Sequence, residues 1–376
     1  MAEVRIEGIA RDYGGTGNPA VRDLTLDIAD GCVVTLLGPS GCGKTTTLRM
    51  IAGLERPDAG TIRVGDKVVA SAEKGTFVPP ERRDIGMVFQ SYALWPHLTV
   101  LENVSYPLRM RRVAKSEMRQ RSMKVLEQVG LQDKADSYPS RLSGGQQQRA
   151  AIARSLVFDP QLLLMDEPFS NLDARLRERM GEDLRELHAK VGVTTVYVTH
   201  DQAEAMVLSD EVVVMHEGRI LDQGSPQKIS LQPATATVAS FLGYNTELRG
   251  VVDEVVSQSE DTQVVRASGV DWSGCCLSAP DLVKGDQITL AIRTRVLTMT
   301  DKPDESGMSC GWLGVVKARR SVGDRDRVTI ACADTTFVLE VDTTCTECRV
   351  GTKVNVRAAA DKVWAVRSGS DLDGNH

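Results

Sequence analysis

Residues 38–46 decide the fold of this chain, and they read Gly38-Pro39-Ser40-Gly41-Cys42-Gly43-Lys44-Thr45-Thr46. The stretch fits G-x-x-x-x-G-K-[ST], a loop whose backbone N–H groups cradle a polyphosphate. An apolar run at 32–37 precedes it and a helix-like run at 47–53 follows it, in the order strand, loop, helix. We predict that Lys44 reaches the β- and γ-phosphates and that Thr45 places its hydroxyl on Mg²⁺. The alternative is a glycine-rich turn that matches by chance.

The composition is that of a globular protein with about two domains. The chain has 376 residues, 41% of them hydrophobic and 26% charged, and one domain typically takes about 100–200 residues. Its 4% aromatic content and net charge of −6 argue against a nucleic-acid partner. No apolar run approaches the roughly 18–20 residues that span a bilayer, and the N-terminus lacks a signal-peptide core. We expect a cytosolic protein.

The eight cysteines are expected to be reduced in that compartment. Cys345 and Cys348 form a lone C-x-x-C, for which thiols on strands and turns are favoured over a zinc knuckle or redox pair. Cys42 lies beside Lys44 at a helix N-terminus, which predicts a lowered thiol pKa. Its alkylation is then expected to block the use of a polyphosphate ligand by this loop, and the bound ligand to protect the thiol.

Alternating polar and apolar residues predict antiparallel hairpins before and after the phosphate loop. Runs at 4–9 and 21–28 flank a segment rich in turn formers, and runs at 60–64 and 67–69 form a second hairpin. Tyr13 falls where the first run ends. Its ring is placed either to stack on a nucleotide base or to serve as a plain edge-strand tyrosine.

Four apolar strands are predicted to end in residues that can bind a ligand or take part in a reaction. These groups are Gly38, Gln90, the pair Asp166 and Glu167, and His200. Ligands bind beyond the carboxyl ends of the strands in parallel α/β sheets, so we expect all of them at one sheet edge.

This convergence suggests phosphoryl-group chemistry with a role for each side chain. Asp166 would hold Mg²⁺ through water, and Glu167 would orient or deprotonate the attacking water. His200 would contact the γ-phosphate, while Gln90 would sense the metal and the water. The alternatives are a strand-end charge for Glu167 and a structural role for the histidine.

A second glycine-bearing helix start lies at residues 142–149, before a helix expected at 150–156, and is a second potential anion site. Residues 101–138 read as helical after Thr99, a fair N-cap. The loop at 91–100 is unusually apolar and aromatic for a surface loop, which indicates that it packs on a partner.

Together these motifs resemble the ATPase of ATP-binding cassette (ABC) transporters over about residues 4–243. Gly38–Thr46 matches the family's Walker A, Gln90 its Q-loop, and Leu142–Gln146 its LSGGQ signature. Leu162–Glu167 matches the Walker B and Ser170–Asp173 the D-loop. His200 matches the switch histidine, and Tyr13 falls where the family has its adenine-stacking aromatic. The resemblance implies an α/β P-loop NTPase cassette at 1–243, with a parallel sheet core, an antiparallel β subdomain and a helical subdomain at about 91–154.

The resemblance also implies the residues of the site. ATP would be bound by Tyr13, Gly38, Ser40, Gly41, Cys42, Gly43, Lys44, Thr45, Thr46, Gln90, Ser143, Gly144, Gly145, Gln146 and Asp173. Mg²⁺ would be held by Thr45, Gln90 and Asp166, and the catalytic residues would be Lys44, Gln90, Glu167 and His200.

The family's assembly supplies the expected partners. Two cassettes would face head to tail, so that Ser143, Gly145 and Gln146 act on the nucleotide of the other copy. The 91–100 loop would meet integral membrane permease subunits, which places the protein peripherally on the cytoplasmic face of the inner membrane. An extracytoplasmic binding protein would deliver the solute. The sequence at 77–83 and 92–97 most resembles that of ATPases from importers of iron(III), polyamines or phosphonates.

From about residue 245, short alternating runs predict a small all-β, OB-like barrel at 244–376. It loosely resembles the tail of importer ATPases for maltose, iron(III), polyamines and phosphonates. Arg293-Thr294-Arg295 stands where such tails usually carry Arg-Pro-Glu.

Four other functions are compatible with parts of this pattern. A soluble ABC ATPase of translation or DNA repair would carry two cassettes or a large insertion, and a P-loop kinase would lack LSGGQ and Glu167. A sugar-importer ATPase and a nucleotide-binding regulator without turnover are the remaining alternatives.

Overall fold

The computed structural model describes residues 2–14, 19–270, 272–300, 309–332, 335–343 and 348–369. The chain divides into two compact units, residues 1–226 and 227–376. Two short helices, α7 (Pro226–Leu231) and α8 (Ala236–Phe241), precede the tail strands, and Trp364 Nε1 donates a hydrogen bond to Pro233 O between them (3.0 Å). This packing groups them with the tail, whereas the predicted boundary after residue 243 follows sequence pattern alone.

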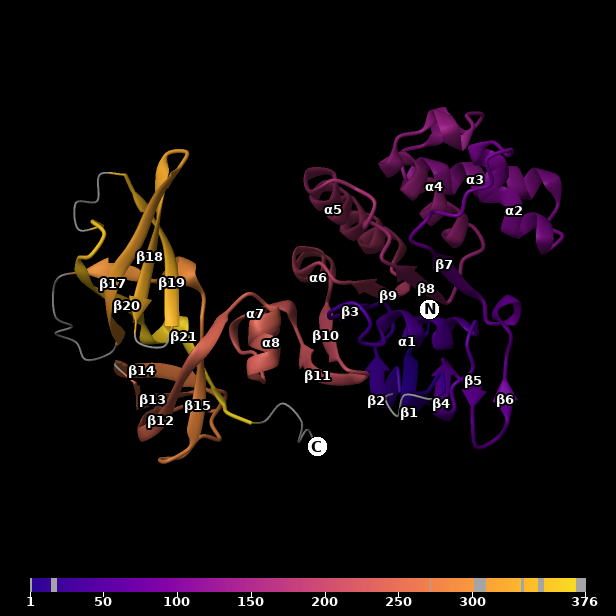
Figure 1. The fold of residues 1–376 in the computed structure, drawn as a ribbon. Helices are drawn as coiled ribbons and strands as arrows, with labels where there is room; N and C mark the ends of the chain where they lie inside the picture. The colour runs from indigo at the N-terminus through magenta and orange to yellow at the C-terminus, as the bar shows by residue number, and fades with distance from the viewer. Residues whose placement is uncertain are drawn as a thin grey trace. The chain divides into compact units, whose positions relative to one another are not determined.

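The core of the first unit is a six-stranded sheet in the order β11-β10-β3-β9-β8-β7 (Figure 1). Its strands from β10 to β7 run parallel, and β11 pairs antiparallel with β10. The strands are β3 (Val33–Leu37), β7 (Ile85–Val88), β8 (Leu162–Asp166), β9 (Thr194–Thr199), β10 (Glu211–His216) and β11 (Arg219–Gly224). Every side chain of β3 and β9 is buried, as predicted for strands covered on both faces.

A five-stranded antiparallel sheet lies in the order β2-β1-β4-β5-β6. Its strands are β1 (Val4–Arg11), β2 (Val21–Ile28), β4 (Ala59–Val64), β5 (Lys67–Ser71) and β6 (Thr76–Phe77). Both predicted hairpins are confirmed by the pairings β1–β2 and β4–β5. The inward side chains of this sheet share a hydrophobic core with β3 and with α1 (Lys44–Ala52).

Side chains on the other face of the central sheet share a second hydrophobic core with helices. They are α2 (Val100–Met110), α3 (Lys115–Gln128), α4 (Gly144–Leu156), α5 (Ala174–Val191) and α6 (Gln202–Leu208). Thr99 caps α2 as predicted, in a reciprocal capping box with Glu102. In Figure 1, α2, α3 and α4 lie together as one helical group. None of the helices in the described ranges is long and apolar enough to cross a membrane.

The tail is all-β after α8, as predicted. Its strands are β12 (Asn245–Gln258), β13 (Gln263–Gly269), β14 (Trp272–Ser278), β15 (Gln287–Ile292), β16 (Thr298–Thr300), β17 (Ser309–Val322), β18 (Arg325–Cys332), β19 (Thr335–Asp342), β20 (Lys353–Ala359) and β21 (Val363–Arg367). The pairings β13–β12–β15–β21–β14 return to β13 and close a five-stranded ring. Ring closure removes exposed strand edges, which is the advantage of a barrel.

Six cysteines are free thiols: Cys32, Cys42, Cys275, Cys276, Cys310 and Cys332. Cys348 is disulfide-bonded, so the expectation that every cysteine is reduced is wrong at that position. Cys345, the other member of the C-x-x-C, lies outside the described residues.

Arg83 holds the C-terminal end of α1, the helix whose other end carries the phosphate loop. Its side chain is buried, and its guanidinium donates hydrogen bonds to the carbonyl oxygens of Met50 (2.8 Å), Ile51 (2.7 Å), Val69 (3.1 Å) and Val78 (2.7 Å). Burial lowers the pKa of Arg83 to about 10, which leaves it charged at neutral pH. A cation at this end of a helix also complements the helix dipole.

We predict that Arg83→Met lowers the free energy of unfolding by about 3–5 kcal/mol, because it leaves several buried carbonyl groups without donors. Urea denaturation followed by circular dichroism measures the change. Arg82→Met is the control, since Arg82 is exposed, and it should cost less than about 0.5 kcal/mol. Equal midpoints for the two variants would contradict the role assigned to Arg83.

Candidate functional site

The parallel strands bring the sequence-predicted groups to one sheet edge. Leu37 at the end of β3 pairs with Thr199 at the end of β9, and Asp166 at the end of β8 pairs with Val198. The phosphate loop, Glu167 and His200 follow directly from these three strand ends. Gln90 lies two residues beyond the end of β7, not on the strand itself.

The phosphate loop closes around its own lysine. Lys44 is buried, and its Nζ donates hydrogen bonds to the carbonyl oxygens of Gly38 (2.7 Å) and Pro39 (2.9 Å). Gly38 tolerates no side chain, because a Cβ there would lie 2.2 Å from the carbonyl oxygen of Met215. Gly43 caps α1 at a φ of 102°, a left-handed conformation that favours glycine. The helix thus begins at Lys44, three residues before the predicted start.

Thr45 and Asp166 form the oxygen-rich part of the site. Thr45 Oγ1 donates a hydrogen bond to Asp166 Oδ1 at 2.9 Å. Burial raises the pKa of Asp166, although the hydrogen bond from Thr45 and the nearby Arg49 act in the opposite direction. A hydroxyl beside a carboxylate is a donor set that suits Mg²⁺.

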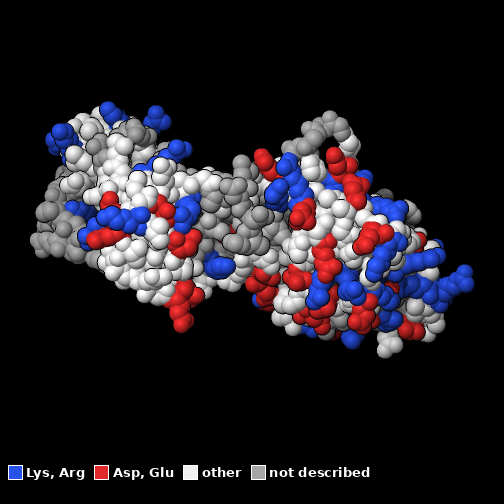
Figure 2. All heavy atoms as spheres, turned by 90° about the horizontal axis from the view of Figure 1, so that it is seen from below, with Lys and Arg blue, Asp and Glu red and all other residues white. Residues whose placement is uncertain are grey.

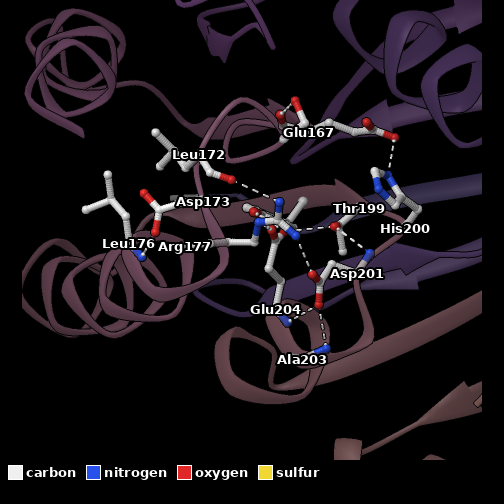
Figure 3. Close-up of polar contacts among 12 residues, drawn as sticks. Glu167, Leu172, Asp173, Leu176, Arg177, Thr199, His200, Asp201, Ala203 and Glu204 are labelled. Atoms are coloured by element: carbon white, nitrogen blue, oxygen red, sulfur yellow. Dashed lines mark hydrogen bonds and ion pairs between the residues drawn. The ribbon is translucent and has the colours of Figure 1, made fainter. Parts of the chain in front are cut away.

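Glu167 and His200 face each other across the ends of β8 and β9. His200 Nδ1 lies 3.2 Å from Glu167 Oε1 (Figure 3). Glu167 has a φ of 43°, which is uncommon for a non-glycine residue and turns the chain sharply after β8. That turn is fixed by hydrogen bonds from Glu167 N to Val198 O (3.0 Å) and from Ser170 N and Oγ to Glu167 O (3.2 and 3.0 Å).

Gln90 and Tyr13 lie around this centre with exposed side chains. Asn171 Nδ2 donates to Gln90 O at 2.9 Å, and within the described ranges no hydrogen bond joins the Gln90 side chain to Thr45 or Asp166. Tyr13 follows β1, so it does not lie on an edge strand, and its side chain is 59% exposed. Its hydroxyl lies 3.4 Å from Thr46 Oγ1 and also contacts Glu55.

The signature residues form the start of α4. Ser143 is the N-cap, and its hydroxyl accepts from Gln146 N (3.4 Å) while Gln146 Oε1 accepts from Ser143 N (3.0 Å). The helix therefore begins at Gly144, and the predicted start at residue 150 is wrong because this capping box nucleates it earlier. A Cβ on Gly145 would lie 3.0 Å from Met180 Sδ. In the part of the chain that the structure describes, no hydrogen bond joins these residues to the phosphate loop.

Asp173 caps the helix that follows the D-loop. Its Oδ1 accepts a hydrogen bond from Leu176 N at 3.0 Å, in the first turn of α5. Asp173 itself is exposed.

The aromatic loop is less exposed than its sequence predicts. Tyr92 is 9% exposed, and Trp95 is half-buried against Tyr106, with ring centroids 4.3 Å apart. Arg154, which sequence reasoning missed, donates hydrogen bonds to the carbonyl oxygens of Tyr92 and Ala93. Much of the apolar surface of residues 91–100 therefore packs inside the unit, and the surface left to solvent is mainly that of Ser91, Ala93, Pro96 and His97.

The prediction of a lowered pKa for Cys42 is wrong. Cys42 is 3% exposed, and its burial raises the thiol pKa more than the nearby Lys44 lowers it. The sequence placed the thiol correctly beside Lys44, whose Nζ lies 3.8 Å from Cys42 Sγ. The sequence pattern does not show how deeply the thiol is buried. Burial decides the pKa here, because a low thiol pKa needs exposed, electropositive surroundings.

A parallel sheet that ends in this glycine loop, an Asp–Glu pair and a histidine defines the class of P-loop NTPases. A family model described as ABC transporter matches residues 21–170. The trehalose/maltose import ATP-binding protein MalK of Thermococcus litoralis is 53% identical over 243 residues, and the match spans 65% of each chain. The Fe(3+) ions import ATP-binding protein FbpC of Brucella abortus is 44% identical over 321 residues, 85% of each chain.

Solved structures agree with these relatives. The cbiO1 protein of Clostridium perfringens, described as part of an ABC transporter complex, has a TM-score of 0.54 and 31% identity, covering 60% of this chain and 89% of that one. A dimeric ATP-binding cassette, MJ0796, bound to ADP and Pi, has a TM-score of 0.51 and 31% identity, covering 59% of this chain and 98% of that one. The chain belongs to the ABC transporter family, and the resemblance read from the sequence is confirmed.

We predict that Cys42 reacts with N-ethylmaleimide at pH 7 at least about tenfold more slowly than glutathione does, because the Cys42 thiol is buried and its pKa is raised above that of a free thiol. Mass spectrometry of tryptic peptides measures the rate, and Cys42→Ser identifies the adduct. The rate should rise with pH as the thiolate forms. A rate equal to that of glutathione would contradict the raised pKa, and a faster rate would support the lowered pKa that the sequence predicts.

Proposed function

We propose that this protein is the ATP-hydrolysing subunit of an ABC importer. The observation that carries the proposal is the Glu167–His200 contact of 3.2 Å, at the same sheet edge as the Thr45–Asp166 pair and the Lys44 loop. ATP hydrolysis requires a base, a polar partner for that base, a metal-binding pair and a phosphate-binding loop at one place, and these residues supply all four. The relatives' names, which describe import ATP-binding proteins, support the transport role.

ATP binds along residues 38–46 at the N-terminus of α1, where backbone N–H groups and Lys44 neutralise its phosphates. The loop fits this ligand because a Cβ on Gly41 would meet nothing within 4 Å, which leaves open space there. The exposed ring of Tyr13 supplies a face for the adenine base. Thr45, Asp166 and Gln90 would hold Mg²⁺, which, when bound, neutralises charge on the β- and γ-phosphates.

Hydrolysis forms a bond from water oxygen to the γ-phosphorus and breaks the bond to the β–γ bridging oxygen. The Glu167 carboxylate takes the proton of the attacking water, and the geometry of its turn orients it. His200 steadies Glu167 through Nδ1 and offers its other ring nitrogen to the γ-phosphate. Gln90 completes the site from the exposed segment after β7.

The active unit is a head-to-tail homodimer of cassettes. Ser143, Gly144, Gly145, Gln146 and Asp173 act on the ATP held by the second copy. Support comes from the exposed Ser143 at the tip of α4, a helix start suited to a phosphate. The dimeric assembly of the similar cassette MJ0796 also supports it.

The transport partners are integral membrane permease subunits that dock on residues 91–100. This places the protein peripherally at the cytoplasmic face of the inner membrane, with an extracytoplasmic solute-binding protein acting through the permeases. The face drawn in Figure 2 intersperses acidic and basic side chains over the first unit, unlike the basic stripe of nucleic-acid binders. We therefore propose no nucleic-acid partner.

The solute is iron(III), a polyamine or a phosphonate, with iron(III) favoured by the names of several relatives. A sugar is the second candidate, because the Thermococcus litoralis relative is named for trehalose and maltose. Co-purification from membranes tests the importer against a soluble ABC ATPase, which would bring down no permease.

We predict that Glu167→Gln binds ATP with unchanged affinity but hydrolyses it about 10²–10⁴-fold more slowly, because the amide cannot accept the proton of the attacking water. Phosphate release and equilibrium binding of a fluorescent ATP analogue measure the two effects. Glu182→Gln is the control, since Glu182 is exposed on α5, and it should hydrolyse at the normal rate. Normal hydrolysis by the Glu167 variant would refute the catalytic assignment.

We predict that Glu167→Gln dimerises when ATP is added. A further Ser143→Arg should abolish this dimer, because the large side chain keeps the start of α4 away from the phosphates of the ATP held by the second copy. Light scattering gives the mass of each species. Ser116→Arg, on the exposed face of α3, is the matched control and should leave the dimer intact. An ATP-dependent dimer that survives Ser143→Arg would rule out this interface.

A further inference from the structure

Arg177 lies in the first turn of α5, between the turn that carries Glu167 and the loop that carries His200 (Figure 3). Its backbone N–H donates to Asp173 O at 2.9 Å, which continues the helix from its cap. Its side chain is only 24% exposed and points from α5 toward the end of β9. Neither the phosphate-loop motif nor the chemistry of the strand ends singles this arginine out.

One arm of the guanidinium holds the residue that follows His200. Arg177 Nη1 donates to Asp201 Oδ2 at 2.7 Å. The other oxygen of Asp201 caps α6 by accepting from Ala203 N (2.8 Å) and Glu204 N (3.3 Å). Burial raises the pKa of Asp201, but these hydrogen bonds, with that from Arg177 foremost, outweigh it and lower the pKa. Asp201 is therefore an anion fixed at both oxygens.

The residue before His200 is fixed by the same network. Thr199 Oγ1 accepts from Asp201 N (3.0 Å) and donates to Glu204 Oε2 (2.7 Å). Tyr197 OH donates to the same oxygen at 2.7 Å. Glu204 is 7% exposed, and its Oε1 lies 3.5 Å from Arg177 Nε. The chain on each side of His200 is thus tied to one buried cluster that Arg177 closes.

The other arm of the guanidinium reaches the turn after the catalytic glutamate. Arg177 Nη2 donates to Leu172 O at 3.1 Å. Leu172 N bonds to Phe169 O (3.0 Å), and Ser170 bonds to Glu167 O, so this turn is continuous with the glutamate. One planar side chain therefore joins the segment of Glu167 to the segment of His200. Arginine suits this task because its donors form a rigid fork.

We propose that Arg177 is a positioning residue that keeps His200 within reach of Glu167, and so sets the rate of ATP hydrolysis without contributing to ATP binding. The proposal rests on the proposed function, since it assumes that Glu167 and His200 act in hydrolysis. A positional error of about 1 Å at a reacting pair costs on the order of 10²-fold in rate. Loss of the fork should therefore lower kcat by about 10- to 100-fold and leave KM for ATP nearly unchanged.

Arg185 provides a matched control on the same helix. It donates to Leu208 O (3.0 Å) and to Asp210 Oδ1 (2.7 Å), which are again one carbonyl and one aspartate. Asp210 holds Val33 N at the start of β3, at the opposite end of the strand from the phosphate loop. Arg185→Ala removes the same kinds of bonds as Arg177→Ala without disturbing either segment of the reacting pair.

The test measures kcat and KM for ATP with the purified full-length protein for Arg177→Ala, Arg177→Lys and Arg185→Ala. We expect kcat to fall about 10- to 100-fold in Arg177→Ala and less in Arg177→Lys, which keeps the charge but not the fork. Arg185→Ala should stay within about twofold of the unchanged protein. Equal kcat values for the two alanine variants would overturn the proposal.

A second measurement separates positioning from general destabilisation. In a His200→Ala background, Arg177→Ala should lower the single-turnover rate by less than about twofold, because the residue it positions is gone. A further 10- to 100-fold loss there would show that Arg177 acts elsewhere and would overturn the proposal. If Arg177→Ala does not fold, Asp201→Asn, which retains the helix cap, takes its place with the same expectations.

Failure of the proposed function gives a different result. An unsubstituted protein without ATPase activity, or a Glu167→Gln variant with normal activity, would refute the catalytic assignment of Glu167 and His200. Normal activity in Arg177→Ala beside an inactive Glu167→Gln would refute only the role assigned to Arg177.

Discussion

The parallel pairing of β3, β9 and β8 is the constraint on which the candidate site depends. Leu37, Thr199 and Asp166 are brought to the same sheet edge by these pairings, and the loops that leave the strands there have only a short distance to cross. The buried side chains of β3 and β9 make any slip of this register costly, because it would move apolar groups out of the two cores that flank the sheet. The positions of the phosphate loop, Glu167 and His200 all follow from this packing.

Three charged groups at or near this edge, the buried Lys44 and Glu204 and the half-buried Asp166, are held by hydrogen bonds to nearby oxygens. Lys44 is bound by two carbonyl groups of its own loop, Asp166 by the hydroxyl of Thr45, and Glu204 by two hydroxyl groups. Such partners offset the cost of removing charge from water, and they restrict each group to one position. Preorganisation of this kind lets a site act on developing charge without first rearranging.

The signature residues remain separate from the phosphate loop within one chain. Ser143 and Gln146 bond to each other at the start of α4, and within the described ranges neither is hydrogen-bonded to residues 38–46. A glycine-bearing helix start with an exposed cap is suited to binding an anion. In the proposed head-to-tail dimer, that anion would be a phosphate of the ATP held by the second copy.

The sequence by itself determined the motifs, the parallel sheet, both early hairpins, the all-β tail and the family, because these follow from residue order and from local periodicity. It also anticipated the groups at the sheet edge, since strand ends can be read from apolar runs. Only the tertiary structure decided the depth of Cys42, the packing of Tyr92 and Trp95 inward, and the bridge that Arg177 forms between two segments. Burial and contacts between distant segments depend on what the rest of the chain places around a residue, and no local pattern records that.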